Sequence, residues 1–243
     1  MKQYTAETYG ECAAPVYDDW HHDYEPAAID VLVESAGQGI ALELGIGSGR
    51  LALPLAERGV RVHGIDAAPS MVARLRAKPG GERIEVSIGD FADVNVQGEF
   101  SLVYVVFNTF FVLLTQEAQV RCFRNVAAHL APGGCFLIEA FVPDLKRFEG
   151  EQTNRVSRVA IDYVELDVSR HERAEQRVVG HKVVMTDGDI RLYPIQIRYA
   201  WPAELDLMAQ LAGLRLRERW SDWKRSPFTS QSGMHISLYE SSR

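Results

Sequence analysis

The 243-residue sequence has few cysteines and no long uninterrupted apolar segment. Cys12, Cys122 and Cys135 are widely separated and show neither zinc-ligand spacing nor a C-x-x-C redox pair, so we interpret them as reduced, structural thiols. Apolar stretches are broken by polar residues well short of a membrane span, and the N-terminus lacks the basic and apolar segments of a secretion signal. The sequence therefore predicts a soluble, cytoplasmic protein with no membrane partner.

Positive charge is also scarce. Lysine and arginine number 26 against 33 aspartates and glutamates, which gives a formal net charge of −7. Nucleic acids and anionic lipids are bound by clustered basic side chains, so this balance argues against both and favours a small-molecule partner. The hydrophobic content of 47% suffices for the core of one large domain, 1–243. The oligomeric state stays open, and a homo-oligomer is compatible with the sequence.

Short apolar runs alternate with amphipathic runs from residue 40 onward. This alternation is typical of an α/β fold in which helices cover both faces of a mostly parallel, doubly wound, Rossmann-like sheet. The expected strands are 40–44, 60–65, 84–88, 101–106, 135–140, 214–219 and 234–240. The expected helices are 50–58, a segment opening at Pro69, 115–130 and 202–212, with a Pro132-Gly133-Gly134 turn before the fifth strand. The sequence thus predicts a seven-stranded sheet.

Two segments fall outside this alternation. Between residues 155 and 199, polar and apolar residues alternate around a Thr186-Asp187-Gly188-Asp189 turn, which predicts antiparallel hairpins. We interpret 145–200 as a small antiparallel β insertion over the sheet edge, near the substrate site. Residues 1–38 are rich in aromatic and acidic side chains in an amphipathic pattern, so we expect a helical lid that closes over a ligand.

Three alternating glycines, Gly45, Gly47 and Gly49, follow the first expected strand. Glycine permits positive φ and lets a ligand approach the backbone, so this turn can hold a nucleoside-bearing cofactor. The spacing is G-x-G-x-G rather than the G-x-G-x-x-G of dinucleotide-binding proteins, and the lysine of a phosphate-binding P-loop is absent. Glu43, just before the turn, would repel a pyrophosphate but can accept a hydrogen bond from an α-ammonium group.

Further candidate cofactor contacts stand at the ends of the next two strands. Asp66 ends the second strand, where a carboxylate can accept hydrogen bonds from both hydroxyls of a ribose. Met71 offers a polarizable apolar surface to an adenine ring. Asp90 and Phe91 follow the third strand, and Asp90 can accept a hydrogen bond from the adenine amine. Matches in this order at successive strand ends distinguish a cofactor site from an ordinary turn.

These residues carry a resemblance to a known family. The run Glu43–Arg50, with Asp66, Asp90-Phe91 and the 132–134 turn, resembles a class I S-adenosylmethionine-dependent methyltransferase over about residues 40–140. The resemblance implies S-adenosyl-L-methionine as cofactor, with Glu43 and the three glycines in the first motif, Asp66 as the ribose carboxylate and Asp90 as the adenine-contacting acid.

The C-terminal stretches 198–205, 211–214 and 226–229 resemble the small-molecule branch of that family. Many members of this branch methylate amines in antibiotic and amino-sugar biosynthesis. The spacing of Tyr9 and Tyr17 is similar to that in N-methyltransferases of lincosamide biosynthesis. The resemblance therefore implies N-methylation of a small-molecule amine.

Methyl transfer from a sulfonium is an in-line displacement, so positioning and a water-poor, aromatic-lined pocket are the main requirements. Phe107 and Asn108 follow the fourth strand, whose carboxyl end should lie beside the methyl group. We expect Phe107 to contact the cofactor and Asn108 to act in catalysis, because a buried amide needs hydrogen-bond partners. Tyr9 and Tyr17 of the lid are expected to orient acceptor or cofactor.

Other reactions are open or disfavoured on the same residues. His21 or His22 could act as the base of a phenol O-methyltransferase, since imidazole titrates near neutrality. A non-catalytic module that only binds the cofactor also stays open. A metal-dependent, catechol-type reaction is disfavoured because no Asp-Asp-Asn cluster is found, and we expect no metal. An adenine-modifying enzyme is disfavoured because residues 106–109 read Val-Phe-Asn-Thr where D/N-P-P-Y/F is expected.

Overall fold

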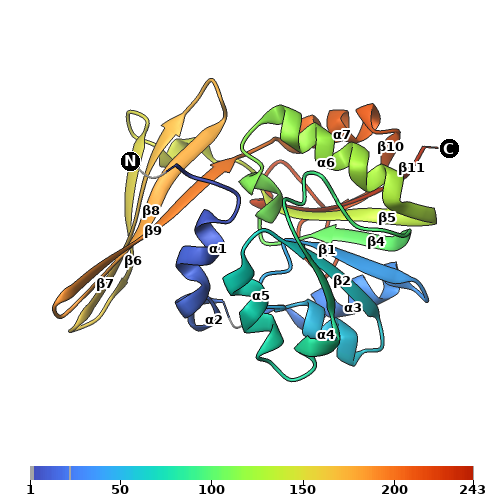
Figure 1. Ribbon diagram of the computed structural model, residues 1–243. Helices are drawn as coiled ribbons and strands as arrows, with labels where there is room; N and C mark the ends of the chain where they lie inside the picture. Colours follow the sequence, from blue (N-terminus) through green and yellow to red (C-terminus); the bar gives the residue numbers. More distant parts are fainter. Residues whose placement is uncertain (1–2, 22, 243) are drawn as a thin grey trace.

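Seven strands form a mostly parallel sheet in the computed structural model, which describes residues 3–21 and 23–242 (Figure 1). The strand order is β10-β11-β5-β4-β1-β2-β3, and β11 runs antiparallel to both of its neighbours. The strands are β1 (Ile40–Leu44), β2 (Arg61–Asp66), β3 (Glu85–Ile88), β4 (Phe100–Val105), β5 (Leu130–Phe141), β10 (Leu214–Trp220) and β11 (Met234–Ser241). The predicted doubly wound fold is confirmed.

Helices cover both faces of this sheet. They are α3 (Pro26–Ala36), α4 (Ala52–Glu57), α5 (Pro69–Arg76), α6 (Gln116–His129) and α7 (Pro202–Leu211). Side chains alternate along a strand, so Ala41 of β1 packs into the core layer beneath α3, whereas Leu42 packs into the layer beneath α6 and α7. Because both faces are buried, the strands read as apolar runs, which is why the sequence located them to within one or two residues at most ends.

The beginning of β5 differs from the prediction. Leu130 already pairs with Phe100 of β4, and the next pair in the ladder is Leu102 with Cys135, so residues 131–134 bulge out of the register. The expected Pro-Gly-Gly turn is therefore an irregularity inside a strand, with Gly133 at a φ of 76°. A bulge keeps the strand continuous while absorbing residues that cannot join the ladder.

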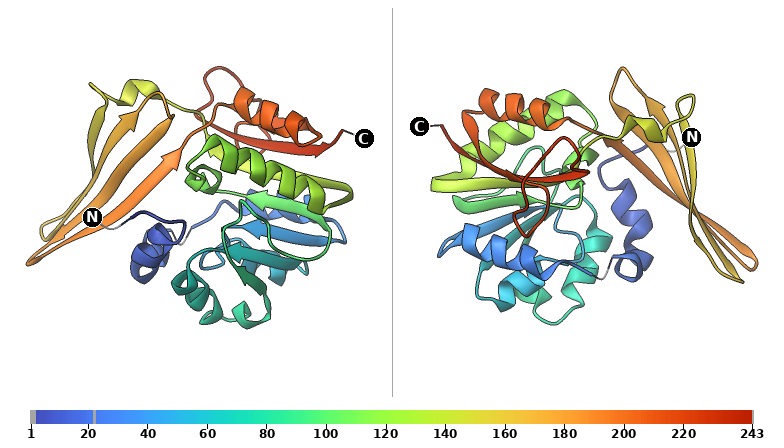
Figure 2. Two further views of the ribbon diagram at one scale, coloured as in Figure 1. Left: turned by 45° about the horizontal axis from the view of Figure 1, so that its top comes forward. Right: turned by 180° about the vertical axis from the view of Figure 1, so that it is seen from behind.

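The insertion forms a separate antiparallel sheet in the order β6-β7-β8-β9. Its strands are β6 (Gln152–Val159), β7 (Tyr163–Glu172), β8 (Arg177–Thr186) and β9 (Asp189–Arg198). The expected turn joins β8 to β9. The sheet stands beyond the carboxyl ends of the parallel strands rather than over an edge strand (Figures 1 and 2). The reason is topological: the insertion leaves from the carboxyl end of β5, an interior strand.

The N-terminal segment lies between the two sheets (Figure 2). It consists of α1 (Thr8–Ala13), the 3₁₀ turn η1 (Ala14–Val16) and α2 (Tyr17–Trp20). On one side, the Tyr4 hydroxyl accepts a hydrogen bond from the Gln196 backbone N–H of β9 at 3.3 Å. On the other, Gly10 packs so closely on Ala68 that a Cβ there would lie 2.5 Å from the Ala68 Cβ. The lid expected over 1–38 is thus shorter, since α3 belongs to the layer that covers the parallel sheet.

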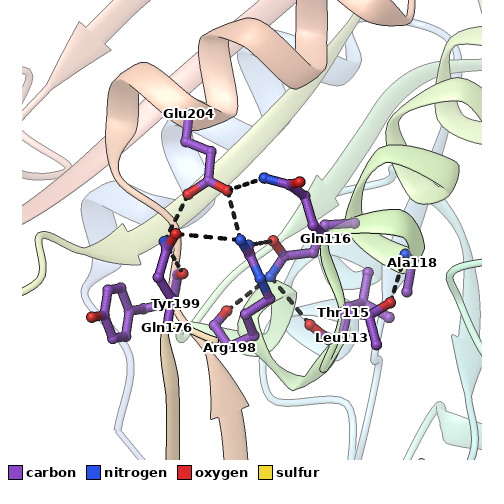
Figure 3. A network of polar contacts seen from close by, with 9 residues as sticks. Leu113, Thr115, Gln116, Ala118, Gln176, Arg198, Tyr199 and Glu204 are labelled. Carbon is purple, nitrogen blue, oxygen red and sulfur yellow. Dashed lines mark hydrogen bonds and ion pairs between the residues drawn. The ribbon is translucent and has the colours of Figure 1, made fainter. Parts of the chain in front are cut away.

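A buried polar network fastens the insertion to the helices of the parallel sheet (Figure 3). Arg198, at the end of β9, donates to Gln119 of α6 at 2.6 Å and pairs with Glu204 of α7 at 2.7 Å. Gln176, just before β8, donates to the other Glu204 oxygen at 2.8 Å. Buried charges are stable only when paired and hydrogen-bonded, so this network fixes the base of the insertion.

The described residues contain no helix with the length and apolar composition of a membrane span. They also contain no group of three or more His, Cys, Asp or Glu side chains arranged to hold a metal ion.

Candidate active site

The glycine loop connects β1 to α4 and adopts the left-handed conformation at all three predicted positions. Gly45, Gly47 and Gly49 have φ values of 74°, 56° and 80°. The N–H groups of Gly45 and Ile46 donate to the Ile65 carbonyl of β2 at 2.8 and 3.0 Å, which fixes the loop at the strand ends. A Cβ on Gly45 would lie 2.5 Å from the Thr109 side chain. The loop therefore requires glycine for its φ values and its close packing.

Asp66 joins this loop to the turn before α5. One of its carboxylate oxygens accepts the Gly47 N–H at 2.7 Å, and the other accepts the Ala68 N–H at 2.8 Å. Burial raises the pKa of this carboxyl group above its ordinary value, against the two backbone hydrogen bonds. Each oxygen has a second lone pair, so the carboxylate can hold the loop and still accept hydrogen bonds from ribose hydroxyls.

Glu43 lies deeply buried behind the loop, with 4% of its surface exposed. The Tyr104 hydroxyl of β4 donates to its Oε2 at 2.9 Å. Burial raises the Glu43 pKa to about 8, although this hydrogen bond and the charge of Arg50 oppose the shift. The Glu43 carboxyl group is therefore mostly protonated at pH 7. A further cation beside it would lower its pKa and favour the ionised form.

The predicted residues after β4 form a strained corner. Phe107 and Asn108 have φ values of 58° and 64°, a conformation that costs energy for side chains other than glycine. Glu139 of β5 holds this corner by accepting the Phe107 N–H at 2.9 Å, and the Trp223 indole N–H donates to its second oxygen at 3.0 Å. Asn108 Oδ1 accepts the Phe141 N–H at 2.7 Å. The side-chain carbonyl of Asn108 thus helps to hold the corner. The side-chain nitrogen of Asn108 makes no hydrogen bond to the described residues.

Arg50 packs directly over this corner, a contact that the sequence did not reveal. Its guanidinium carbon lies 3.0 Å from the centre of the Phe107 ring, close to Glu43, Glu139 and Tyr17. Burial lowers the Arg50 pKa, and these surrounding groups oppose the shift. Among the described residues, its guanidinium makes one hydrogen bond, a long one of 3.5 Å to the Asp23 carbonyl. The Phe107 ring therefore presents a face that already accommodates a cation.

The N-terminal segment is latched onto the glycine loop by Asp18. Its carboxylate accepts the Ser48 hydroxyl of the loop at 2.5 Å, pairs with Lys78 at 2.8 Å and pairs with Arg74 at 2.9 Å. Burial opposes the shift, but the hydrogen bonds from Lys78, Ser48 and Arg74 hold the Asp18 pKa below its ordinary value. Glu11 adds a second attachment by accepting the N–H and hydroxyl of Ser70 in the first turn of α5 at 2.9 and 2.6 Å.

Of the predicted lid residues, Tyr17 lies beside the glycine loop and Arg50. Burial raises the pKa of both Tyr9 and Tyr17, and the positive charge of Arg50 opposes this shift in both phenols. The centre of the His21 ring lies 4.8 Å from the centre of the Tyr17 ring. Burial lowers the pKa of His21, and the charges of Arg50 and Lys182 lower it further. Trp20 instead packs edge-on against Tyr193 of β9 at 4.6 Å. The other candidate base, His22, lies outside the described residues.

The predicted adenine contacts lie at the second and third strand ends. Met71 is buried between the lid and the loop, and a Cβ on Gly47 would lie 3.1 Å from its methyl group. Phe91 is buried in the core layer beneath α6, next to Gly45. Asp90 is exposed and accepts the Ala92 N–H at 2.8 Å, which leaves one carboxylate oxygen for another donor. Of these three predicted adenine contacts, Asp90 is exposed, whereas Met71 and Phe91 are buried.

The cavity in front of the loop has a volume of about 20 Å³ and is lined by the lid, the loop and the strained corner. Its walls include Tyr17, Glu43, Ser48, Arg50 and Phe107. A larger hollow of about 590 Å³ lies at the opposite, amino ends of β2 and β3, and none of the predicted site residues lines it. Ligands of open α/β sheets bind at the carboxyl ends of the strands, which makes the smaller cavity the candidate site.

Known proteins match this chain in sequence and in fold. A family model described as a methyltransferase domain matches residues 41–134. The CcbJ methyltransferase from Streptomyces caelestis is 37% identical, has a TM-score of 0.93, and is matched over 99% of this chain and 100% of its own. The chain belongs to the S-adenosylmethionine-dependent methyltransferases. Its cofactor is S-adenosyl-L-methionine.

Two further relatives of this methyltransferase carry N-methylation in their names. The cypemycin N-terminal methyltransferase from a Streptomyces species is 28% identical over 92% of this chain and 94% of its own. The sugar N-methyltransferase KedS8 from a Streptoalloteichus species is 17% identical with a TM-score of 0.68, over 98% of this chain and 95% of its own. At that identity, KedS8 shows the shared fold alone.

Proposed function

We propose that this methyltransferase N-methylates a small-molecule amine by positioning and desolvation. The observation that carries the proposal is the shared lining of the cavity at the glycine loop: Tyr17 of the N-terminal segment and the Phe107 ring, which already stacks on the Arg50 cation, line it together. A sulfonium needs such a face, and its methyl group is protected when water is excluded. The similarity to the cypemycin N-terminal methyltransferase supports the choice of nitrogen as acceptor.

The cofactor would be held along the carboxyl ends of β1 to β4. Glu43 would accept from the α-ammonium group, Asp66 from the ribose hydroxyls and Asp90 from the adenine amine. Bound S-adenosylmethionine supplies an electrophilic methyl group. The residues proposed to contact it are Glu43, Gly45, Gly47, Gly49, Asp66, Met71, Asp90, Phe91 and Phe107.

The residues proposed for catalysis are Tyr9, Tyr17 and Asn108. Both phenols are protonated at neutral pH, and burial raises their pKa further above the ordinary value, so they can act as hydrogen-bond donors that orient the acceptor. The Asn108 side-chain nitrogen is available as a further donor. Only the neutral amine can attack the methyl group, so the acceptor must first lose the proton of its ammonium form. A weak base is sufficient for this step.

His21 favours one other candidate, O-methylation of a phenol. Its lowered pKa keeps the imidazole neutral at pH 7, as a base requires, and it lies beside Tyr17. The two reactions differ in how far they depend on this base. With an amine acceptor at pH 9, His21→Ala should retain turnover within about threefold of the parent; with a phenol acceptor, loss of an essential base should cost at least about 100-fold.

The test is methyl transfer from labelled cofactor to a panel of amines, amino sugars and phenols. We expect label in amines, with a rate that rises with pH until the acceptor is neutral. Label confined to phenols, together with near-complete loss in His21→Ala, would replace the proposal with the O-methylation reading. Cofactor binding without transfer to any acceptor would favour the non-catalytic module.

A further inference from the structure

Phe107 is held in a backbone conformation that its side chain disfavours. The Val106 carbonyl accepts the Thr109 N–H at 3.1 Å, which closes a tight turn around Phe107 and Asn108. Both central residues have positive φ, as in a type I′ turn, for which glycine, asparagine and aspartate are the usual residues. Asn108 fits this preference, but a bulky phenylalanine does not. Such strain persists only where the surroundings impose it, and it is concentrated at functional sites.

One residue of β5, Glu139, restrains both central residues of this turn. Its carboxylate accepts the Phe107 N–H at 2.9 Å, and its backbone carbonyl accepts the Asn108 N–H at 3.3 Å. Glu139 interrupts the otherwise apolar run 135–141, and only 8% of its surface is exposed. Burying a carboxylate in such a strand costs free energy that an apolar residue would not. The carboxylate therefore serves the turn rather than the core.

Trp223 fixes the second oxygen of the same carboxylate. Its indole N–H donates to Glu139 Oε1 at 3.0 Å, and its ring is buried in the core layer beneath α3. Trp223 lies between β10 and β11, just before the 226–229 stretch that resembles small-molecule methyltransferases. With one oxygen bonded to the core and the other to the turn, the orientation of the carboxylate is fixed. The segment between β10 and β11 thus acts on the turn through Glu139.

The turn, rather than Glu139, contacts the cavity at the glycine loop. Val106, Phe107 and Thr109 are among the described residues that line this cavity, and Glu139 is not. We propose that Glu139 is a positioning residue for the cofactor, which holds the turn so that the Phe107 ring faces the sulfonium. This role rests on the cofactor contact proposed above for Phe107.

Two ligands isolate the interaction with the sulfonium. S-adenosylmethionine carries the positive sulfur and its methyl group, whereas S-adenosylhomocysteine has a neutral thioether at the same place and shares every other group. In the ratio of their dissociation constants, contacts to the adenosine and amino-acid parts cancel. A residue with a merely structural role would change both constants by the same factor and leave this ratio unchanged.

Titration calorimetry with both ligands tests the proposal on the full chain. The variants are Glu139→Gln, Phe107→Leu and the two combined. The glutamine has one acceptor oxygen for two N–H donors, so one restraint is lost, and leucine removes the aromatic face but stays apolar. Trp223→Phe keeps the carboxylate and its charge and removes only its second restraint. The matched control is Glu204→Gln, which weakens the ion pair with Arg198 outside the turn.

We expect Glu139→Gln and Phe107→Leu each to raise the ratio of the S-adenosylmethionine constant to the S-adenosylhomocysteine constant about tenfold, the size of one desolvated cation–π contact. Trp223→Phe should raise it by a smaller factor, about threefold. The combined variant should match Phe107→Leu, because Glu139 acts through the ring. Glu204→Gln should leave the ratio unchanged.

The contrary outcomes are distinct. If Glu139→Gln shifts the ratio as much in the Phe107→Leu background as in the parent, the charge of Glu139 acts directly and the positioning role is overturned. A shift in Phe107→Leu without one in Glu139→Gln and Trp223→Phe overturns this inference alone. An unchanged ratio in Phe107→Leu overturns it together with the proposed Phe107 contact. Binding requires no acceptor, so each result is independent of whether the methyl group is transferred to nitrogen or oxygen.

Discussion

Asp66 has two tasks in this site, one structural and one proposed for the cofactor. Its two oxygens already hold the glycine loop and the turn before α5. Asp66→Ala should weaken S-adenosylhomocysteine binding by about 2–4 kcal/mol, roughly 30- to 700-fold. The substitution leaves backbone N–H donors of the protein and the ribose hydroxyl donors of the ligand without an acceptor. Titration calorimetry measures the effect, with Glu85→Ala as a control at an exposed carboxylate of β3.

Asp66→Asn separates the two tasks, since an amide keeps one acceptor for the loop and introduces a donor. Binding should fall between that of Asp66→Ala and the parent, with the thermal midpoint of unfolding close to the parent's. Parent-like affinity in both variants would show that Asp66 does not contact the cofactor.

Glu43 should release a proton when the cofactor binds. Its pKa of about 8 keeps it protonated at pH 7, and an α-ammonium group beside it would lower that pKa. The bound state therefore carries fewer protons than the free state, so affinity should rise as pH increases from 6 to 7.5. Calorimetry at pH 7 in buffers of different ionisation enthalpy should give a release approaching one proton per cofactor.

Glu43→Gln provides the control, because it keeps the size and an acceptor for the Tyr104 hydroxyl but cannot ionise in this range. Its proton release should fall towards zero and its affinity should vary less with pH. Equal proton release in parent and variant would assign the titration to another group.

The phenols of Tyr9 and Tyr17 should affect turnover rather than folding. Phenylalanine keeps each ring in its packing and removes only the hydroxyl group. We expect each variant to lose about tenfold to 100-fold in kcat, with an unchanged unfolding midpoint, if the hydroxyl orients the acceptor in the transition state. Steady-state kinetics with an accepted amine provide the measurement, and an unchanged kcat in both variants would remove the tyrosines from the mechanism.

At the scale of elements, Asp18 couples the lid to the glycine loop. It is partly buried and has three partners, on the loop and on or just after α5, so its contribution should exceed that of an exposed ion pair. Asp18→Asn should weaken S-adenosylhomocysteine binding about tenfold and speed amide hydrogen exchange in residues 3–21. Arg58→Ala, which breaks the exposed pair with Asp30, is the matched control and should change neither. Unchanged exchange in the Asp18 variant would contradict the latch.

At the scale of the whole molecule, periodicity predicted the parallel sheet and its order of elements because both faces of its strands are buried. The glycine loop and Asp66 could also be located from the sequence, because their spacing follows from a local strand-to-helix turn. The position of the insertion was not, because alternation identifies a strand but not the sheet edge or ligand site beside which it will lie.

The remaining site residues depend on contacts between distant parts of the chain. Tyr104 meets Glu43 across 61 residues, and Lys78 meets Asp18 across 60. Glu139 is one carboxylate in an apolar strand, and nothing local indicates that it holds the Phe107 corner. One signal was available: Arg74 and Lys78 are spaced four residues apart, as on one helix face, near an acidic N-terminal segment. Their pairing with Asp18 follows that pattern.

Methyl transfer by this protein is proposed to end on nitrogen. The most direct measurement uses cofactor labelled with ¹³C in its methyl group, acceptors that each carry both an amine and a hydroxyl group, and NMR of the purified product. We expect a single new resonance with the chemical shift and proton couplings of an N-methyl group, formed faster as pH rises towards the pKa of the acceptor amine. A resonance of an O-methyl group, with the amine unmodified, would contradict it.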